Sequence, residues 1–280
     1  MENSEKIKQL VKEKYSEIAL QEKEQNLSSC CGASCSSGEV YNIMSDDYTA
    51  MEGYNADADL GLGCGLPTQF AKIKKGDVVI DLGSGAGNDC FIARSETGET
   101  GKVIGVDMTE AMIDRARINA EKTGYHNVEF RLGEIEKLPV SSGVADVIVS
   151  NCVLNLLPDK KKAFSEIHRV LKPGGHFSIA DIVLSGPLPE KIVQTAEMYA
   201  GCVAGAILKK DYLALIREAG FENITIQKEK VITIPDDILA GYLTADEITD
   251  YRNSQAGTFS ITVYGEKKAE PCCDKDTCCN

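Results

Sequence analysis

The sequence predicts an α/β fold in which helices cover both faces of a mostly parallel, seven-stranded sheet. Three observations predict it. Between residues 76 and 183, short runs rich in valine and isoleucine alternate with longer segments of helical periodicity. A glycine-rich turn, DLGSGAG, follows directly at the end of the first of these runs. Of the 280 residues, 43% are hydrophobic, which suffices for one large domain with appendages or for two small domains.

An amphipathic helix is predicted at the N-terminus, within residues 1–26. Apolar side chains recur on one face of this segment and indicate a helix docked on the core; they are Ile7, Leu10, Val11, Tyr15 and Ile18. The segment lacks the basic start, the continuous apolar block and the small-residue cleavage site of a signal peptide.

Five parallel strands are expected next, joined by helices in right-handed crossovers. The strands are predicted at residues 76–83, 101–108, 128–135, 144–151 and 176–183, and the helices at 88–96, 110–124 and 159–171. Gly124 and the KPGG sequence are helix stop signals. A helical lid is expected from Leu188 to Ile207, followed by a helix at 209–221. Two further strands, at 224–234 and 257–267, are expected to close the sheet edge.

Charge and cysteine content argue against several classes of function. The formal charge of −13 would repel the phosphate backbone of a nucleic acid, and no basic stripe offsets this repulsion. No apolar run is long enough to span a bilayer, so no membrane partner is expected. The eleven cysteines are an odd number in a chain without an export signal, which argues against a disulfide scaffold. In a reducing cytoplasm, such an excess indicates metal binding or redox chemistry.

The turn DLGSGAG predicts a cofactor site, because glycines between a strand and a helix let a ligand approach the backbone. Its G-x-G-x-G spacing differs from the G-x-G-x-x-G of dinucleotide sites. Asp81 at the mouth would repel a pyrophosphate and would favour a sulfonium ligand that carries an ammonium group. Asp107 ends the second strand, where a carboxylate accepts hydrogen bonds from ribose hydroxyls. Met108 beside it is placed to pack on an adenine ring.

The motifs DLGSGAG, GVDMT, RLGEIEKLPV and VLKPGG together resemble class I S-adenosylmethionine-dependent methyltransferases, which have a Rossmann-like fold. The resemblance spans roughly the middle half of the chain and implies S-adenosylmethionine as cofactor. It implies that Gly83 and Gly85 line the methionine end, that Glu134 and Ile135 edge the adenine, and that Asn151 flanks the cofactor. The complete predicted cofactor site is Asp81, Gly83, Ser84, Gly85, Asp107, Met108, Glu134, Ile135 and Asn151.

The surroundings of the cysteines resemble a narrower family, the arsenite methyltransferases. The matching segments are SCCG, GLGCG, DLGSGAGNDCF, LGEIEKLPV, SNCVLNL and YAGCVAGA, and they extend from Cys30 to about residue 221. The resemblance implies that Cys64, Cys152 and Cys202 hold trivalent arsenic during catalysis, and that Cys30 or Cys31 takes part in binding or redox turnover. One departure is Leu66, where many relatives carry a polar residue.

The chemistry suits these residues. Soft thiolates select thiophilic ions, and trivalent arsenic bound by three thiolates keeps a lone pair that can attack a sulfonium methyl group. The attacking atom carries no proton, so no general base is needed, and the three histidines at 126, 168 and 176 are interpreted as structural. Cys90 is interpreted as a small buried hydrophobe. Cys152 and Cys202 fall at a ligand-side turn and in the predicted lid, which favours ligands.

The predicted protein is thus a cytoplasmic detoxifying enzyme that receives arsenic as a thiol conjugate, with small thiols or thioredoxin as reductant. The alternatives are a class I methyltransferase for a small organic acceptor and a metalloid-binding protein without catalysis. Four parts are expected. They are residues 1–60 (helix and Cys-rich loop), 61–184 (cofactor-binding domain), 185–268 (metalloid-binding lid and the end of the sheet) and 269–280 (disordered Cys-rich tail).

Overall fold

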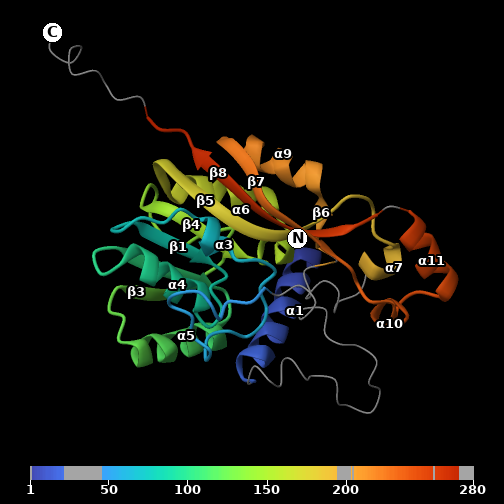
Figure 1. The fold of residues 1–280 in the computed structure, drawn as a ribbon, viewed down its shortest axis with the longest axis horizontal. Coiled ribbons are helices and arrows are strands. Elements are labelled where there is room, and N and C mark those ends of the chain that lie inside the picture. The colour runs from blue at the N-terminus through green and yellow to red at the C-terminus, as the bar shows by residue number, and fades with distance from the viewer. Residues whose placement is uncertain (1, 22–45, 194–202, 204, 255, 271–280) are drawn as a thin grey trace, which may run out of the picture.

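A computed structural model describes residues 2–21, 46–193, 203, 205–254 and 256–270 (Figure 1). Several predicted features lie outside these residues: Cys30, Cys31, Cys202, the last ten residues, and the middle of the lid expected from Leu188 to Ile207.

The centre of the fold is one mixed sheet. Its strands are β1 (Val78–Leu82), β2 (Lys102–Asp107), β3 (Val128–Leu132), β4 (Ala145–Asn151), β5 (Leu171–Leu184), β6 (Ile207–Leu208), β7 (Phe221–Ile232) and β8 (Thr258–Lys267). They follow the order β3-β2-β1-β4-β5-β8-β7, with β6 paired to β5. The strands from β1 to β5 run parallel, whereas β8 lies antiparallel between β5 and β7. The mostly parallel sheet is therefore confirmed, and the two-residue β6 is an eighth strand that was not predicted.

Helices cover both faces of this sheet, as predicted (Figure 1). They are α1 (Glu2–Ala19), α3 (Pro67–Phe70), α4 (Asn88–Thr97), α5 (Glu110–Thr123), α6 (Lys160–Val170), α7 (Glu190–Val193), α9 (Lys209–Glu218), α10 (Asp236–Leu239), α11 (Ala245–Asn253) and the 3-10 turn η2 (Leu154–Leu156). Alternate residues of β1 point to opposite faces. Val79 belongs to the cluster of Phe91 in α4, whereas Ile80 belongs to the cluster of Phe164 in α6 and Tyr212 in α9.

Local signals explain where several helices begin and end. Gly124 terminates α5 in the left-handed conformation, with φ of 68°, which its lack of a Cβ permits. Helix α6 ends at Val170, just before the KPGG sequence, as predicted. The chain then enters β5 directly and forms no loop. The helices α10 and α11 were not predicted. A capping box between Thr244 and Glu247 starts α11, and its T-x-x-E pattern is visible in the sequence.

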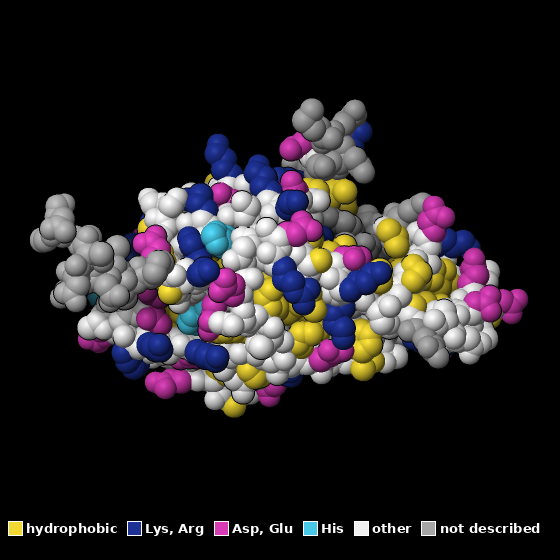
Figure 2. All heavy atoms as spheres, turned by 90° about the horizontal axis from the view of Figure 1, so that it is seen from above, with side chains coloured by type: hydrophobic (Ala, Val, Ile, Leu, Met, Phe, Trp, Pro, Cys, Tyr) yellow, Lys and Arg dark blue, Asp and Glu magenta, His cyan; other side chains and the backbone are white. Residues whose placement is uncertain are grey.

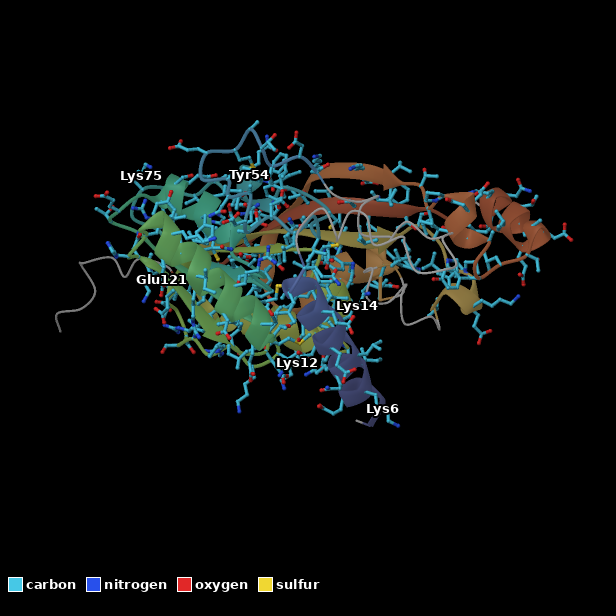
Figure 3. All side chains as sticks on the ribbon, turned by 90° about the horizontal axis from the view of Figure 1, so that it is seen from below. Lys6, Lys12, Lys14, Tyr54, Lys75 and Glu121 are labelled. Atoms are coloured by element: carbon cyan, nitrogen blue, oxygen red, sulfur yellow. The ribbon has the colours of Figure 1, made fainter. Side chains whose placement is uncertain are left out.

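The N-terminal helix α1 packs beside α5 at the ligand-binding edge of the sheet (Figure 3). Val11 and Ile18 are buried, as predicted for its apolar face. The prediction was wrong for Leu10, which is 37% exposed because the contact face of α1 is narrower than its apolar stripe. The guanidinium of Arg115 in α5 donates to the carbonyl oxygen of Ala19 at 2.9 Å, so the end of α1 is tied to the core.

The surface carries charges of both signs. On the face shown in Figure 2, lysine and arginine side chains are interspersed with aspartate and glutamate side chains. Among the helices that the structure describes, none combines the length and the apolar character needed to cross a bilayer. The sheet is continuous across the boundary predicted near residue 184, because β5 pairs with β8 from Leu184 to His176.

Candidate active site

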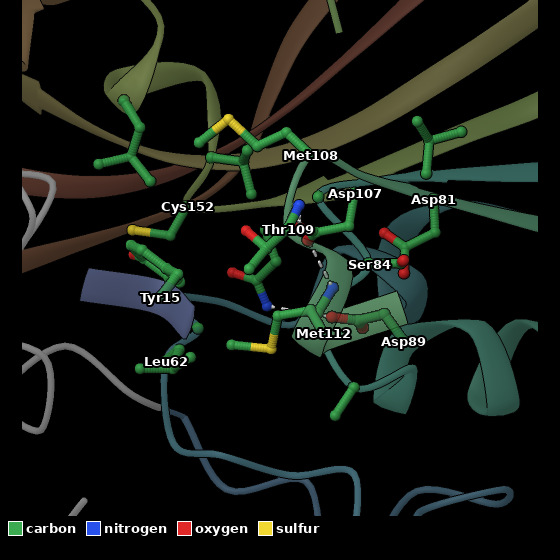
Figure 4. A pocket seen from close by; sticks show the side chains of 18 of the residues that line it. Tyr15, Leu62, Asp81, Ser84, Asp89, Asp107, Met108, Thr109, Met112 and Cys152 are labelled. Carbon is green, nitrogen blue, oxygen red and sulfur yellow. Dashed lines mark hydrogen bonds between the residues drawn. The ribbon is translucent and has the colours of Figure 1, made fainter. Parts of the chain in front are cut away.

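A cavity lies at the carboxyl ends of β1, β2 and β4, where ligands of open α/β sheets bind (Figure 4). All nine predicted cofactor residues line it, and so does Cys152. Figure 4 shows Asp81, Ser84 and Asp89 on one side of the cavity, with Cys152 and Tyr15 across from them. The structure therefore brings together residues that the sequence separates by more than a hundred positions.

The glycines of the DLGSGAG turn have different roles. A Cβ at Gly83 would lie 2.4 Å from a methyl carbon of Val153, so Gly83 lets the turn after β4 pack closely. A Cβ at Gly85 would meet only the sulfur of Met112, at 4.0 Å, and the φ of Gly85 is +50°. Gly85 thus leaves room for a ligand at the cavity wall, where a side chain would intrude.

Asp107 is held in place by the backbone around it. One carboxylate oxygen accepts a hydrogen bond from the Gly85 amide at 3.0 Å, and the other accepts one from the Thr109 amide at 2.8 Å. Burial raises the pKa of Asp107. Each carboxylate oxygen can accept more than one hydrogen bond, so acceptor capacity remains for a pair of hydroxyls.

One part of the cavity is acidic. Burial raises the pKa of Asp81 well above its usual value, and the charges of Asp89 and Asp107 raise it further. Burial also raises the pKa of Asp89, to about 6. Within the described part of the chain, none of the three forms a salt bridge with a lysine or arginine. Uncompensated buried carboxylates favour a cationic ligand.

The predicted adenine edge is covered by α1, which the sequence did not reveal. Val11 and Tyr15 of α1 line the cavity together with Met108, Glu134 and Ile135. Lys8 of the same helix forms a 2.7 Å salt bridge with Glu134 and a 3.3 Å salt bridge with Glu136. The N-terminal helix is therefore a wall of the site.

Two of the predicted arsenic ligands lie beside this cavity. Cys152 follows β4 with a φ of +60°, unusual for a residue other than glycine, and its amide donates to the Ala180 carbonyl at 2.8 Å. Cys64 is fully buried, and its amide donates to Oδ1 of Asn151 at 3.0 Å. Both cysteines belong to one packed cluster, which also contains Val203. The described residues hold no group of three or more metal-binding side chains, and Cys202 lies outside them, next to Val203.

Comparison with known proteins decides the family. A family model described as a methyltransferase domain matches residues 73–220. The arsenite methyltransferase of Halobacterium salinarum is 44% identical over 239 residues, and that of Homo sapiens is 38% identical over 165 residues. The crystal structure of CrArsM, an arsenic (III) S-adenosylmethionine methyltransferase from Chlamydomonas reinhardtii, superimposes with a TM-score of 0.63 at 33% identity. This chain belongs to the arsenite methyltransferase family.

The coverage of these matches differs. The match to the Halobacterium protein covers 79% of this chain and 59% of that relative. The match to the human protein covers 56% of this chain and 44% of that relative. The match to the algal structure covers 82% of this chain and 74% of the algal chain. The chain thus spans less than two thirds of the length of these two sequence relatives.

The cofactor of this arsenite methyltransferase family member is S-adenosylmethionine, and the residues present fit it. The acidic part of the cavity suits a ligand with sulfonium and ammonium charges, and Asp107 offers acceptors for ribose hydroxyls. The hydroxyl oxygen of Ser84 is buried and has no hydrogen-bond partner in the described part of the structure. Gly85 leaves the cavity wall free of side chain. We expect these residues to bind and orient the cofactor.

Cys90 is fully buried, and its thiol donates to a carboxylate oxygen of Asp81 at 3.2 Å. The structure confirms that Cys90 is buried, and it adds a hydrogen bond to Asp81 that the interpretation as a small hydrophobe did not include. The three histidines do not line the cavity. His168 packs edge-on against the Phe221 ring, and Nε2 of His176 lies 2.6 Å from the Ala71 carbonyl oxygen.

Two polar residues, Asp89 and Tyr48, are among the lining residues that sequence reasoning missed. Asp89 lines the cavity from the first turn of α4, and Tyr48 lines it from the segment before the GLGCG loop. An acidic residue in the first helical turn after a glycine-rich loop was the available signal for Asp89. No local pattern singles out Tyr48, since its partners are distant in the sequence.

We expect Asp89 to make cofactor affinity depend on pH. Its pKa near 6 means that the carboxylate becomes neutral as the pH falls below that value. The ammonium group of S-adenosylhomocysteine should bind the ionised form better, so the affinity for this ligand should fall between pH 7.5 and pH 5, and binding should release a proton. In Asp89→Asn, affinity should be about tenfold lower at pH 7.5 and should depend less on pH than in the wild type. Calorimetry in two buffers of different ionisation enthalpy measures both effects; an unchanged pH profile in the variant would exclude Asp89 as the titrating group.

Proposed function

We propose that this chain transfers methyl groups from S-adenosylmethionine to trivalent arsenic held by the thiolates of Cys64, Cys152 and Cys202. The position of Cys152 carries the proposal, because its thiol forms part of the wall of the cofactor cavity. Cys64 supports it, since it belongs to the same packed cluster. Val203 of that cluster is the sequence neighbour of Cys202, which supports the convergence of three thiols.

The proposed chemistry balances without a general base. Arsenic arrives as a thiol conjugate, and each cysteine displaces one small thiol, which leaves with the proton of the cysteine. When bound, the cofactor supplies an electrophilic methyl group on a sulfonium. The arsenic lone pair forms the As–C bond, and the electrons of the broken S–C bond remain on sulfur. The attacking atom carries no proton, which fits a cavity without histidine.

The protein contributes positioning, which is worth about 7–11 kcal/mol when two reactants are well aligned. Asp107 and the acidic residues of the cavity orient the cofactor, and the turn at Cys152 orients the acceptor. Helix α1 lines one side of the cavity with Val11 and Tyr15.

Renewed methylation requires reduction of the oxidised arsenic. The lone pair is consumed in each transfer, so two electrons must be returned before the next one. We infer that small thiols or thioredoxin supply them, with Cys30 or Cys31 taking part in the exchange. The cysteine content supports a reducing cytoplasm as the location and arsenic detoxification as the role.

Turnover of the purified full chain with S-adenosylmethionine, glutathione and arsenite tests the proposal. We expect S-adenosylhomocysteine to form only when arsenite is present, together with an equal amount of methyl groups on arsenic, both measured by liquid chromatography and mass spectrometry. Turnover with an organic acceptor but not with arsenite would favour the rival methyltransferase. Arsenite bound to the cysteines without any turnover would favour a metalloid-binding protein.

A further inference from the structure

The loop that carries Cys64 is clamped from several sides. A Cβ at Gly63 would lie 2.6 Å from Nδ2 of Asn151, and one at Gly65 would lie 2.7 Å from Cβ of Ala180. These glycines permit a close approach that any other residue would prevent. The hydroxyl of Ser260 in β8 donates to the Cys64 carbonyl at 2.6 Å. The position of Cys64 is thus set by tertiary contacts.

Asn151 is the main contact of this loop on the cofactor side. Its Oδ1 accepts from the Cys64 amide at 3.0 Å, and its Nδ2 donates to the Gly65 carbonyl at 2.8 Å. Nδ2 also donates to the hydroxyl of Tyr48 and lies 3.3 Å from Oδ2 of Asp89. One side chain therefore contacts the thiol loop, the tyrosine and the acidic wall of the cavity.

The Tyr48 hydroxyl connects the Cys64 loop to the acidic wall of the cavity. Tyr48 is 5% exposed, and its hydroxyl lies 3.0 Å from the Gly65 carbonyl oxygen and 3.0 Å from Oδ2 of Asp89. A phenol has one proton, so it donates fully to only one of these two acceptors at a time. Asp89 faces the cavity, and its described hydrogen-bond partners are Tyr48, Thr68 and Asn151, whereas Gly65 follows Cys64, a proposed arsenic ligand.

We propose, building on the proposed function, that Tyr48 is a positioning residue that couples cofactor binding at Asp89 to the placement of the Cys64 loop. Without cofactor, the ionised Asp89 draws the phenolic proton. An ammonium group of the ligand beside Asp89 competes for its lone pairs, so the Tyr48 hydroxyl donates its hydrogen bond to the Gly65 carbonyl instead and tightens the loop. Cofactor binding then orders the acceptor thiol through one hydrogen bond.

Tyr48→Phe removes this proton and keeps the ring. Tyr264→Phe is the matched control, because Tyr264 is also buried and donates to a carboxylate, Glu266 at 2.6 Å, away from the cavity. Hydrogen exchange is measured for peptides that cover residues 61–66, with and without saturating S-adenosylhomocysteine, and needs no arsenic. The ligand should slow exchange of the Cys64 amide in the wild type and in the control, but not in Tyr48→Phe.

Kinetics give a second readout. In Tyr48→Phe, kcat for arsenite should fall about tenfold to a hundredfold, as expected for a misplaced reactant. The affinity for S-adenosylhomocysteine should change by less than about tenfold, the upper value for one net hydrogen bond. Retained kcat together with retained ligand-dependent protection would overturn the proposal.

A second variant covers the case in which Tyr48→Phe fails to fold. Asp89→Asn leaves the tyrosine in place and removes the charge, so it should also lose the ligand-dependent protection at saturating ligand; full protection would contradict the coupling. If the wild type shows this protection but does not methylate arsenite, the proposed function fails while the positioning role of Tyr48 stands.

Discussion

Cys152→Ser is expected to lower arsenite methylation by about a hundredfold or more while leaving S-adenosylmethionine affinity nearly unchanged. Serine preserves the shape and the amide hydrogen bond to the Ala180 carbonyl, which is 2.8 Å long. It replaces a soft thiolate by a hydroxyl that is a poor ligand for arsenic and rarely ionises. The loss should therefore appear in arsenic binding and in turnover, measured by mass spectrometry and by S-adenosylhomocysteine release.

Cys90→Ser is the matched control, since Cys90 is buried near the site without lining the cavity. A serine hydroxyl can still donate to Asp81, as the thiol does. This variant should retain most of its activity. If Cys152→Ser methylates arsenite at the wild-type rate, Cys152 does not hold the acceptor and the proposed function loses its main support.

Asp107→Ala is expected to weaken S-adenosylmethionine binding by about a hundredfold, since two charge-assisted hydrogen bonds to the ribose would be lost. The same change removes the acceptor for the Gly85 and Thr109 amides, which lie 3.0 Å and 2.8 Å from it. The glycine turn would then lose part of its support. Calorimetry with S-adenosylhomocysteine measures the affinity, and thermal unfolding separates it from any loss of stability.

The control for Asp107→Ala is Asp114→Ala, which removes the same charge from the exposed side of α5, where the Asp114 side chain is 71% exposed. Its affinity should equal that of the wild type. Equal affinities in the two variants would remove Asp107 from the ribose site and leave the cofactor held by the other residues of the cavity.

Much of the cofactor site could be predicted from the sequence, because it rests on local patterns. Asp81 and Asp107 each stand at the end of an apolar run, and parallel strands bring their carboxyl ends to one edge of the sheet. The glycine turn and the stop at Gly124 depend on backbone conformations that are encoded within a few residues. Right-handed crossovers were predicted for the parallel strands, whereas the order β3-β2-β1-β4-β5-β8-β7 is known only from the structure.

Only the tertiary structure decided how the thiols and the cofactor cavity are related. Cys64 and Asn151 are 87 positions apart, yet one hydrogen bond joins them. The predicted adenine edge of the cavity is covered by α1. The periodicity of this helix indicated that one face is buried, but not which part of the protein that face contacts. Tyr48 had no local signal at all, because the partners of its hydroxyl, Gly65, Asp89 and Asn151, are all distant in the sequence. A sequence pattern specifies which face of an element is apolar or where a turn occurs, whereas the partner of a single polar atom depends on packing between distant segments.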